Sequence, residues 1–129
     1  MTKKKLDFYV EKIKEFNHLR GWHQLPQNNA KSIVIEAAEL LEHFQWDGEI
    51  NNSSKYQLQD KNITEIKKEA ADVFWYLVAF CRESGFELVD AVELKYKHNM
   101  VKYPLKMFEK ENSVELYYQR KNEYRKNKK

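Results

Sequence analysis

The sequence predicts an all-α domain, from its scarcity of turn residues, its composition and the spacing of its apolar residues. Only three glycines and two prolines occur among 129 residues, too few for the many turns of a β fold. Hydrophobic residues make up 42% and charged residues 33%, as in folded, soluble domains. Apolar residues recur at three- and four-residue spacing, the period of an amphipathic helix. We therefore expect a four-helix domain with a short C-terminal helix.

Helices are expected over residues 6–20, 31–46, 62–84, 88–102 and, as the short C-terminal helix, 114–124. Gly21 ends the first helix, Asn62 and Glu65 fit a capping box at the start of the third, and Pro104 follows the end of the fourth. We assign residues 1–110 to the main domain and residues 111–129 to the C-terminal helix and a basic tail.

Charge and hydropathy favour a cytoplasmic location. The net charge is +3, with lysines concentrated in the last ten residues, and such a tail is more often a solvated end than a nucleic-acid arm. The first ten residues lack the apolar stretch of a secretory signal. The apolar run over 70–81 is too short to span a bilayer and contains Asp72. Cys81 lies in that run and is expected to be a buried thiol.

Two carboxylates interrupt the most apolar segment, EAADVFWYLVAFC at 69–81. Eleven of its thirteen residues are apolar, and the other two are Glu69 and Asp72. Spacing alone means little, because twenty acids give about three such pairs by chance and five occur. At about 100° per residue, however, both acids project onto the stripe that carries Tyr76. An inward-facing acidic pair therefore needs an explanation.

A second acidic pair lies on the helix expected over 31–46. Glu36 borders its apolar face, Glu39 lies about 60° further round, and Glu42 is on the opposite side. Buried carboxylates require cationic partners, protonation or a metal ion. The two lysines just before Glu69 project more than about 90° away from it, which makes them poor local partners. From the residues alone, salt bridges and a site for Mg²⁺ or Mn²⁺ are equally supported.

The acidic pairs EAAE at 36–39 and EAAD at 69–72 resemble the ExxE…ExxD signature of the MazG-like nucleoside triphosphate pyrophosphohydrolases. The stretches AELLEHFQW, ADVFWYLV and DAVELKYKHNMVKYP are similar to the branch with dCTP pyrophosphatases and integron-associated MazG proteins. The resemblance covers about residues 16–104. It implies an all-α domain completed by dimerisation, commonly into a homotetramer. It further implies Mg²⁺-dependent cleavage of a (d)NTP such as dCTP to (d)NMP and pyrophosphate, in nucleotide-pool housecleaning.

Carried over to this sequence, the resemblance implies a metal site of four carboxylates: Glu36, Glu39, Glu69 and Asp72. It also implies a carboxylate that takes a proton from the attacking water, for which we prefer Glu39 over Glu36. The implied substrate-binding residues are aromatic side chains around the base, and cationic, amide or tyrosine side chains at the phosphates and sugar: Trp22, Trp46, Tyr76, Lys31, Lys95, Asn99, Lys102 and Tyr103. Without the resemblance, a core position for Tyr76 is equally well supported. For Lys95, Asn99 and Lys102, which share one face of the fourth helix, a solvated face is then favoured.

This sequence departs from the family pattern at positions expected to contact the nucleotide, while the four metal-binding carboxylates are retained. Gln27 stands where family members often have a cation, so Lys31 is the candidate replacement. The loop between Trp22 and Pro26 is about two residues shorter than in the dCTP pyrophosphatases, and a histidine before the proline is absent. Trp75 projects to the far side of its helix from the acids, and we expect it at an oligomer contact.

Two other classes of protein compete with this interpretation. A di-iron carboxylate bundle needs two Glu-x-x-His motifs, and the chain has one, Glu15–His18. A helical interaction protein, or a non-catalytic nucleotide-binding protein on the same fold, would account for the apolar faces and the basic tail. An interaction protein would not account for acids along an aromatic stripe. Acids also repel phosphate backbones, which disfavours a nucleic-acid partner.

Overall fold

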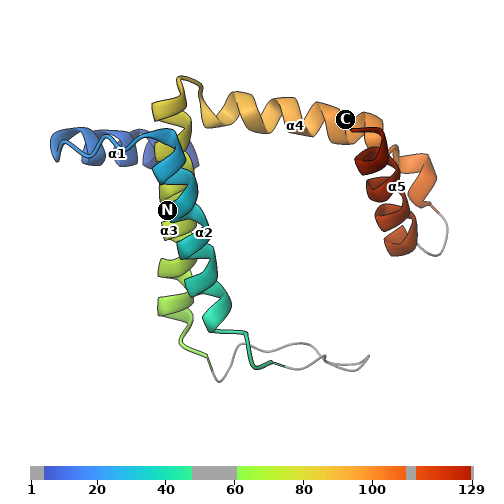
Figure 1. Ribbon diagram of the computed structural model, residues 1–129, viewed down its shortest axis with the longest axis horizontal. Coiled ribbons are helices and arrows are strands. Elements are labelled where there is room, and N and C mark those ends of the chain that lie inside the picture. Colours follow the sequence, from blue (N-terminus) through green and yellow to red (C-terminus); the bar gives the residue numbers. More distant parts are fainter. Residues whose placement is uncertain (1–4, 48–60, 110–112, 129) are drawn as a thin grey trace. The chain divides into compact units, whose positions relative to one another are not determined.

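The computed structural model describes residues 5–47, 61–109 and 113–128, and the regular elements in these ranges are all helical. In chain order they are α1 (Leu6–Leu19), α2 (Pro26–Glu42), α3 (Ile63–Ser84), α4 (Leu88–Lys102), the short 3₁₀ helix η2 (Leu105–Phe108) and α5 (Ser113–Asn127) (Figure 1). The predicted all-α class is confirmed. The chain forms two compact units, Met1–Leu88 and Val89–Lys129, which are described separately.

The first unit is built around α3. Helix α2 lies alongside α3 over most of its length, and α1 crosses α3 near its C-terminal end (Figure 1). Ile13 of α1 and Val78 and Cys81 of α3 are the fully buried apolar side chains among the described residues. Burial raises the pKa of the Cys81 thiol, in agreement with the expected inert, buried cysteine.

Local capping signals placed several helix ends correctly. The Asn62 side chain accepts a hydrogen bond from the Glu65 backbone N–H at 3.2 Å, which satisfies a donor in the first turn of α3. Gly85 follows α3 with φ 82°, and Gly21 follows α1 with φ 65°. Both conformations lie in the left-handed region that glycine adopts without a Cβ clash. The bounds of α4 are those predicted.

The second helix differs from its prediction at both ends. Helix α2 begins at Pro26 rather than Lys31, because Pro26 occupies the first helical turn, where its missing N–H costs nothing. Residues 26–30 lie between the helices expected over 6–20 and 31–46, and in the structure they are helical. The helix ends at Glu42, and turns continue to Trp46. Helix α5 is longer than predicted. Most of the segment between the helices expected over 31–46 and 62–84, residues 48–60, lies outside the described residues.

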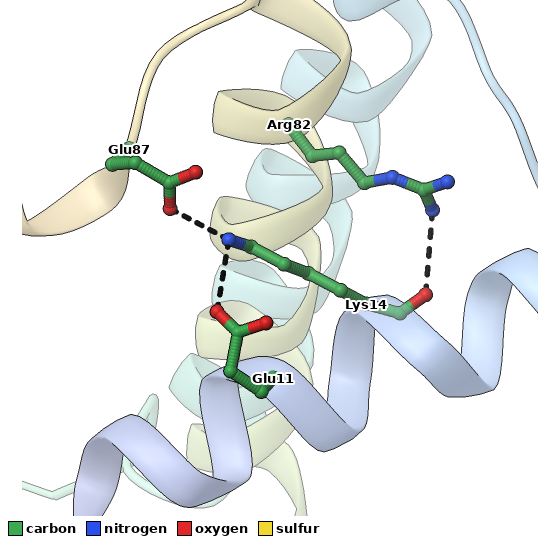
Figure 2. Close-up of polar contacts among 4 residues, drawn as sticks. All are labelled: Glu11, Lys14, Arg82 and Glu87. Atoms are coloured by element: carbon green, nitrogen blue, oxygen red, sulfur yellow. Dashed lines mark hydrogen bonds and ion pairs between the residues drawn. The ribbon is translucent and has the colours of Figure 1, made fainter.

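A polar cluster fastens α1 to the C-terminal end of α3 (Figure 2). Lys14 Nζ of α1 lies 2.6 Å from Glu87 Oε2, in the turn after α3, and 3.2 Å from Glu11 Oε1. The hydrogen bond that Lys14 donates to Glu87 is the main cause that raises the pKa of Lys14. Arg82 of α3 donates to the Lys14 carbonyl at 3.4 Å. Each contact is weak by itself, but together they orient α1 across α3.

The second unit consists of α4, η2 and α5. Arg120 Nε of α5 donates to the Lys102 carbonyl at 3.0 Å, and the rings of His98 and Tyr124 lie 5.7 Å apart. Tyr103 packs against Tyr117 with ring centroids 5.2 Å apart. Helix α5 is therefore held against the C-terminal half of α4. In neither unit do the described residues include a helix long and apolar enough to cross a membrane.

We predict that Asn62→Ala lowers the free energy of unfolding by about 1 kcal/mol, because it leaves the Glu65 N–H without its acceptor. Urea unfolding followed by circular dichroism measures the change. Asn62→Ser retains an acceptor and serves as the control, with a smaller expected loss. Equal losses in both variants would contradict the capping role.

Candidate functional site

Three carboxylates from two helices converge in the first unit. The carboxylate oxygens of Glu36 on α2 and of Glu69 and Asp72 on α3 lie within 4.8 Å of one another. Glu36 and Glu69 are half-buried, and Asp72 is exposed. The side chain of Glu39, one turn after Glu36, shares hydrogen bonds with those of Glu36 and Glu69. The four carboxylates named by the sequence therefore lie in one cluster, here called the acid cluster.

Two members of the acid cluster, Glu36 and Glu69, have raised pKa values, so they lose their protons less readily than isolated carboxyl groups. Burial, the hydrogen bond with Glu39 and the charges of Glu39, Asp72 and Glu69 raise the pKa of Glu36 to about 7. Burial, followed by Glu39 and Asp72, also raises the pKa of Glu69, while His43 acts in the opposite direction. A cation in the cluster would remove this repulsion.

Salt bridges do not account for the acid cluster. In the parts of the chain that the structure describes, none of its four members forms an ion pair with a lysine or arginine. Lys68, a neighbour of Glu69 in sequence, pairs instead with Glu65 at 3.0 Å. Of the two explanations that the sequence left open, the geometry favours a hard divalent cation, because its ligands are carboxylate oxygens brought together from two helices.

An aromatic pocket of about 270 Å³ opens beside the acid cluster. Side chains of α1, the loop after it, α2 and α3 line it: Phe16, Asn17, Trp22, Gln24, Asn29, Asp72, Trp75, Tyr76, Ala79 and Glu83. The Phe16 ring packs edge-on against Trp22 and Trp75, with centroids 5.7 and 5.0 Å away. Asp72 belongs both to the acid cluster and to the wall of this pocket. A molecule bound in the pocket would thus lie beside the acids.

Two buried asparagines that the sequence analysis did not single out support the pocket walls. Asn17 is 4% exposed, and its Oδ1 accepts a hydrogen bond from Trp75 Nε1 at 3.0 Å while its carbonyl accepts from the Trp22 N–H at 2.9 Å. Asn29 is 2% exposed and donates to the Gln24 carbonyl at 3.3 Å. The signal for Asn17 was available, since it lies one turn after the buried Ile13 on the same face of α1.

Trp75 is placed differently from its prediction. Its ring forms part of the pocket wall against Phe16 and Asn17, and its predicted contact in an oligomer stays a prediction. The helical projection of α3 put Trp75 on the far side of the helix from both Glu69 and Asp72, but Trp75 and Asp72 line the same pocket. That side is covered by α1, and the crossing of α1 over α3 is invisible to a projection of one helix.

The structure groups only some of the predicted substrate residues with the acids. Trp22 and Tyr76 line the pocket that contains Asp72. Lys31 is exposed on α2, and Trp46 is 87% exposed in the turn after α2. The remaining four, on or just after α4, belong to the second unit: Lys95, Asn99, Lys102 and Tyr103. Their roles toward a substrate stay predictions.

Comparison with known proteins identifies the family. The model of the MazG-like family matches residues 31–119. The chain belongs to the MazG-like family. This MazG-like chain is 33% identical over 93 residues to dCTP pyrophosphatase 1 of Rattus norvegicus and 32% identical to that of Mus musculus; each match covers 70% of the chain and 54% of the relative. The chain thus matches about half the length of these relatives.

A solved structure supports the same assignment for the fold. A pyrophosphatase from Archaeoglobus fulgidus DSM 4304 is 34% identical and superposes with a TM-score of 0.63, covering 81% of this chain and 96% of that one. The resemblance inferred from the acidic pairs is therefore confirmed, and the matched region of the MazG-like chain includes all four members of the acid cluster.

We predict that, without divalent metal, Glu36 makes the protein less stable as pH rises from about 4.5 to 7. Its contribution to the free energy of unfolding falls over this range. The folded protein holds the Glu36 proton in this range after the unfolded chain has lost it, so the unfolded state binds fewer protons. Urea unfolding in EDTA across this range measures the slope, and Glu36→Gln should make it less negative. Glu42→Gln, an exposed site on the same helix, is the control. Parallel pH profiles for wild type and Glu36→Gln would contradict the assignment.

Proposed function

We propose that this chain is a nucleoside triphosphate pyrophosphohydrolase that cleaves a (d)NTP to the (d)NMP and pyrophosphate. The observation that carries the proposal is the position of Asp72, which lies in the acid cluster and in the wall of the aromatic pocket. One molecule with a flat ring and a chain of phosphates fits both features. The names of the relatives, dCTP pyrophosphatase and pyrophosphatase, support the same activity.

The acid cluster fits Mg²⁺, with Mn²⁺ as the alternative, held by Glu36, Glu39, Glu69 and Asp72. Carboxylate oxygens are the ligands that these ions prefer, and burial together with the neighbouring acids raises the pKa values of Glu36 and Glu69, which supports a cation at this position. A bound Mg²⁺ would neutralise the phosphates and polarise the phosphorus toward attack. The wider family is consistent with dependence on a divalent metal.

The protein groups account for the remaining parts of the reaction. Glu39 accepts a proton from water, whose oxygen attacks the α-phosphorus; the bond from this phosphorus to the oxygen that bridges it to the β-phosphate breaks, and pyrophosphate leaves. Glu36, joined to Glu39 by a hydrogen bond, is the second candidate for this base. Trp22 and Tyr76 contact the nucleoside, since aromatic faces stack on any base. The lysines of α4 serve the phosphates.

The substrate preference we propose is for deoxynucleotides such as dCTP, in a housecleaning role toward the nucleotide pool. It rests on the relatives named dCTP pyrophosphatase 1. Gln27, where the family often has a cation, and the short loop after Trp22 are the positions at which this chain would differ in base preference. The cytoplasmic location belongs to the same proposal.

We also propose that the chain works as a homodimer or as a dimer of dimers. On α2, Val34, Ile35 and Leu41 expose large apolar side chains, more surface than an isolated small domain normally leaves in water. Few side chains of the first unit are fully buried, so one copy builds only a thin core. A second copy related by a two-fold axis would cover these faces.

We predict turnover of one or more of the eight common NTPs and dNTPs, only with divalent metal, to monophosphate plus pyrophosphate. Ion-exchange chromatography separates these products from diphosphate plus orthophosphate. Asp72→Asn should reduce kcat by at least about a hundredfold through the loss of a ligand. Its free energy of unfolding should stay equal or rise, because a neutral amide relieves repulsion in the acid cluster.

The matched control is Glu42→Gln, which removes one exposed carboxylate from α2 and should leave kcat unchanged. Full activity in Asp72→Asn would contradict the site. Nucleotide binding without turnover in the wild type would favour a non-catalytic protein on the same fold, and release of orthophosphate would indicate a different phosphatase reaction.

We predict that light scattering reports a mass of at least two chains at micromolar concentration, and that Val34→Asp with Ile35→Lys shifts it toward one chain by placing charges on the exposed face of α2. The pair leaves net charge unchanged. A monomeric wild type would contradict the proposed assembly.

A further inference from the structure

A second, cationic pocket of about 510 Å³ lies between α4 and α5 within the second unit. Its cationic side chains recur at helical spacing on one face of each helix, and with Tyr124 and Asn127 they line the pocket: Lys95, His98 and Lys102 on α4, and Lys121, Arg125 and Lys128 on and just after α5. Five of these are lysines or arginines. Like charges converge here from two different helices.

Carboxylates do not balance this charge. Among the residues that the structure describes, no aspartate or glutamate lines the cationic pocket. Glu93 of α4 pairs with Lys97 at 2.7 Å, and Glu123 of α5 pairs with Arg120 at 3.4 Å; neither Lys97 nor Arg120 lines the pocket. The other acids of these two helices, Asp90 and Glu115, lie in their first turns and do not line the pocket either. No lining carboxylate therefore balances the positive charge of the cationic pocket.

Lys102 gives an independent indication of a ligand. The residue is 8% exposed, and its ammonium lies over the rings of Tyr103 and Tyr124, 5.1 and 4.7 Å from their centroids. Among the described residues, no carboxylate lies within ion-pair distance of it. Cation–π contacts with aromatic rings offset only part of the free energy needed to remove an ammonium group from water. An anion in the pocket would supply the missing counter-charge.

Helix capping does not explain the arrangement. Cations in the last turn of a helix interact favourably with its dipole, and Lys102 and Arg125 occupy such positions. Lys95 and Lys121, however, lie near the middle of their helices, where this effect is negligible. The α5 cations also lie beyond residue 119, where the match to the family ends. They are therefore a feature of this chain that the family match does not cover.

We propose that the cationic pocket binds an oligophosphate, with Lys121 and Arg125 of α5 adding to the α4 lysines. A pyrophosphate group carries several negative charges on closely spaced oxygens, which matches lysines as point charges and the planar donor pair of arginine. The part played by Lys95 and Lys102 rests on the proposed function, in which they serve the phosphates of the substrate. Binding itself requires no turnover, so the two proposals can fail separately.

The test is calorimetric titration of the full chain with inorganic pyrophosphate in EDTA. Without divalent metal the acid cluster repels pyrophosphate, so binding reports on the cationic pocket. We expect Lys121→Gln with Arg125→Gln to weaken binding at least about tenfold. The control, Lys106→Gln with Lys126→Gln, removes the same charge from exposed sites of the same unit that do not line the pocket, and should change binding less than about twofold.

Further measurements separate the sources of the oligophosphate. If the ligand is the triphosphate of the substrate, the KM of the Lys121/Arg125 variant rises while that of the control stays constant. If KM is unchanged in both, the pocket takes a free oligophosphate. Lys121→Arg with Arg125→Lys retains both charges and should restore most of the affinity.

Three outcomes would overturn the proposal. The first is a wild-type chain that does not bind pyrophosphate in EDTA. The second is an equal loss of affinity in the variant and the control, which would indicate general attraction by net charge. The third is tight binding of a single-stranded RNA oligonucleotide without binding of pyrophosphate, which would assign the pocket to a nucleic-acid backbone.

Discussion

Repulsion among four carboxylates held between α2 and α3 is the constraint on which the first unit depends. The side-by-side packing of these helices brings the acids together, and burial together with the neighbouring carboxylates raises the pKa of Glu36. The packing must therefore draw its stability from elsewhere. The buried Val78 and Cys81 lie further along α3, where α1 crosses it. Apolar contact at one end of α3 thus offsets charge repulsion nearer its start.

Helix α1 converts this two-helix arrangement into a pocket. It carries Phe16 and Asn17 to the side of α3 that bears Trp75, and its orientation is fixed by the contacts of Lys14 with Glu87 and of Arg82 with the Lys14 carbonyl (Figure 2). Asn17 then joins the Trp22 backbone to the Trp75 ring. Polar contacts at the end of α3 in this way determine the shape of an aromatic cavity one or two turns away.

The sequence predicted what depends on short stretches of chain and missed what depends on helix crossings. The bounds of α3 and α4 followed from a cap and from Pro104, which act over a few residues. The acid cluster followed from helical projection together with the family resemblance. Trp75 and the buried Asn17 and Asn29 could not be placed in this way, because their surroundings come from α1 and the following loop. The early start of α2 was missed because Pro26 in a first helical turn looks the same, in sequence, as a proline in a loop.

Asp72 has a consequence for how such a protein can change. The same helical turn supplies an acid and part of the wall that surrounds a ligand, so these two properties do not vary independently. A larger or smaller side chain in the aromatic pocket alters the solvation of Asp72, and through it the proton affinities of Glu36 and Glu69. A change that reshapes this cavity for another ligand would therefore also shift the acidity of the neighbouring carboxylates.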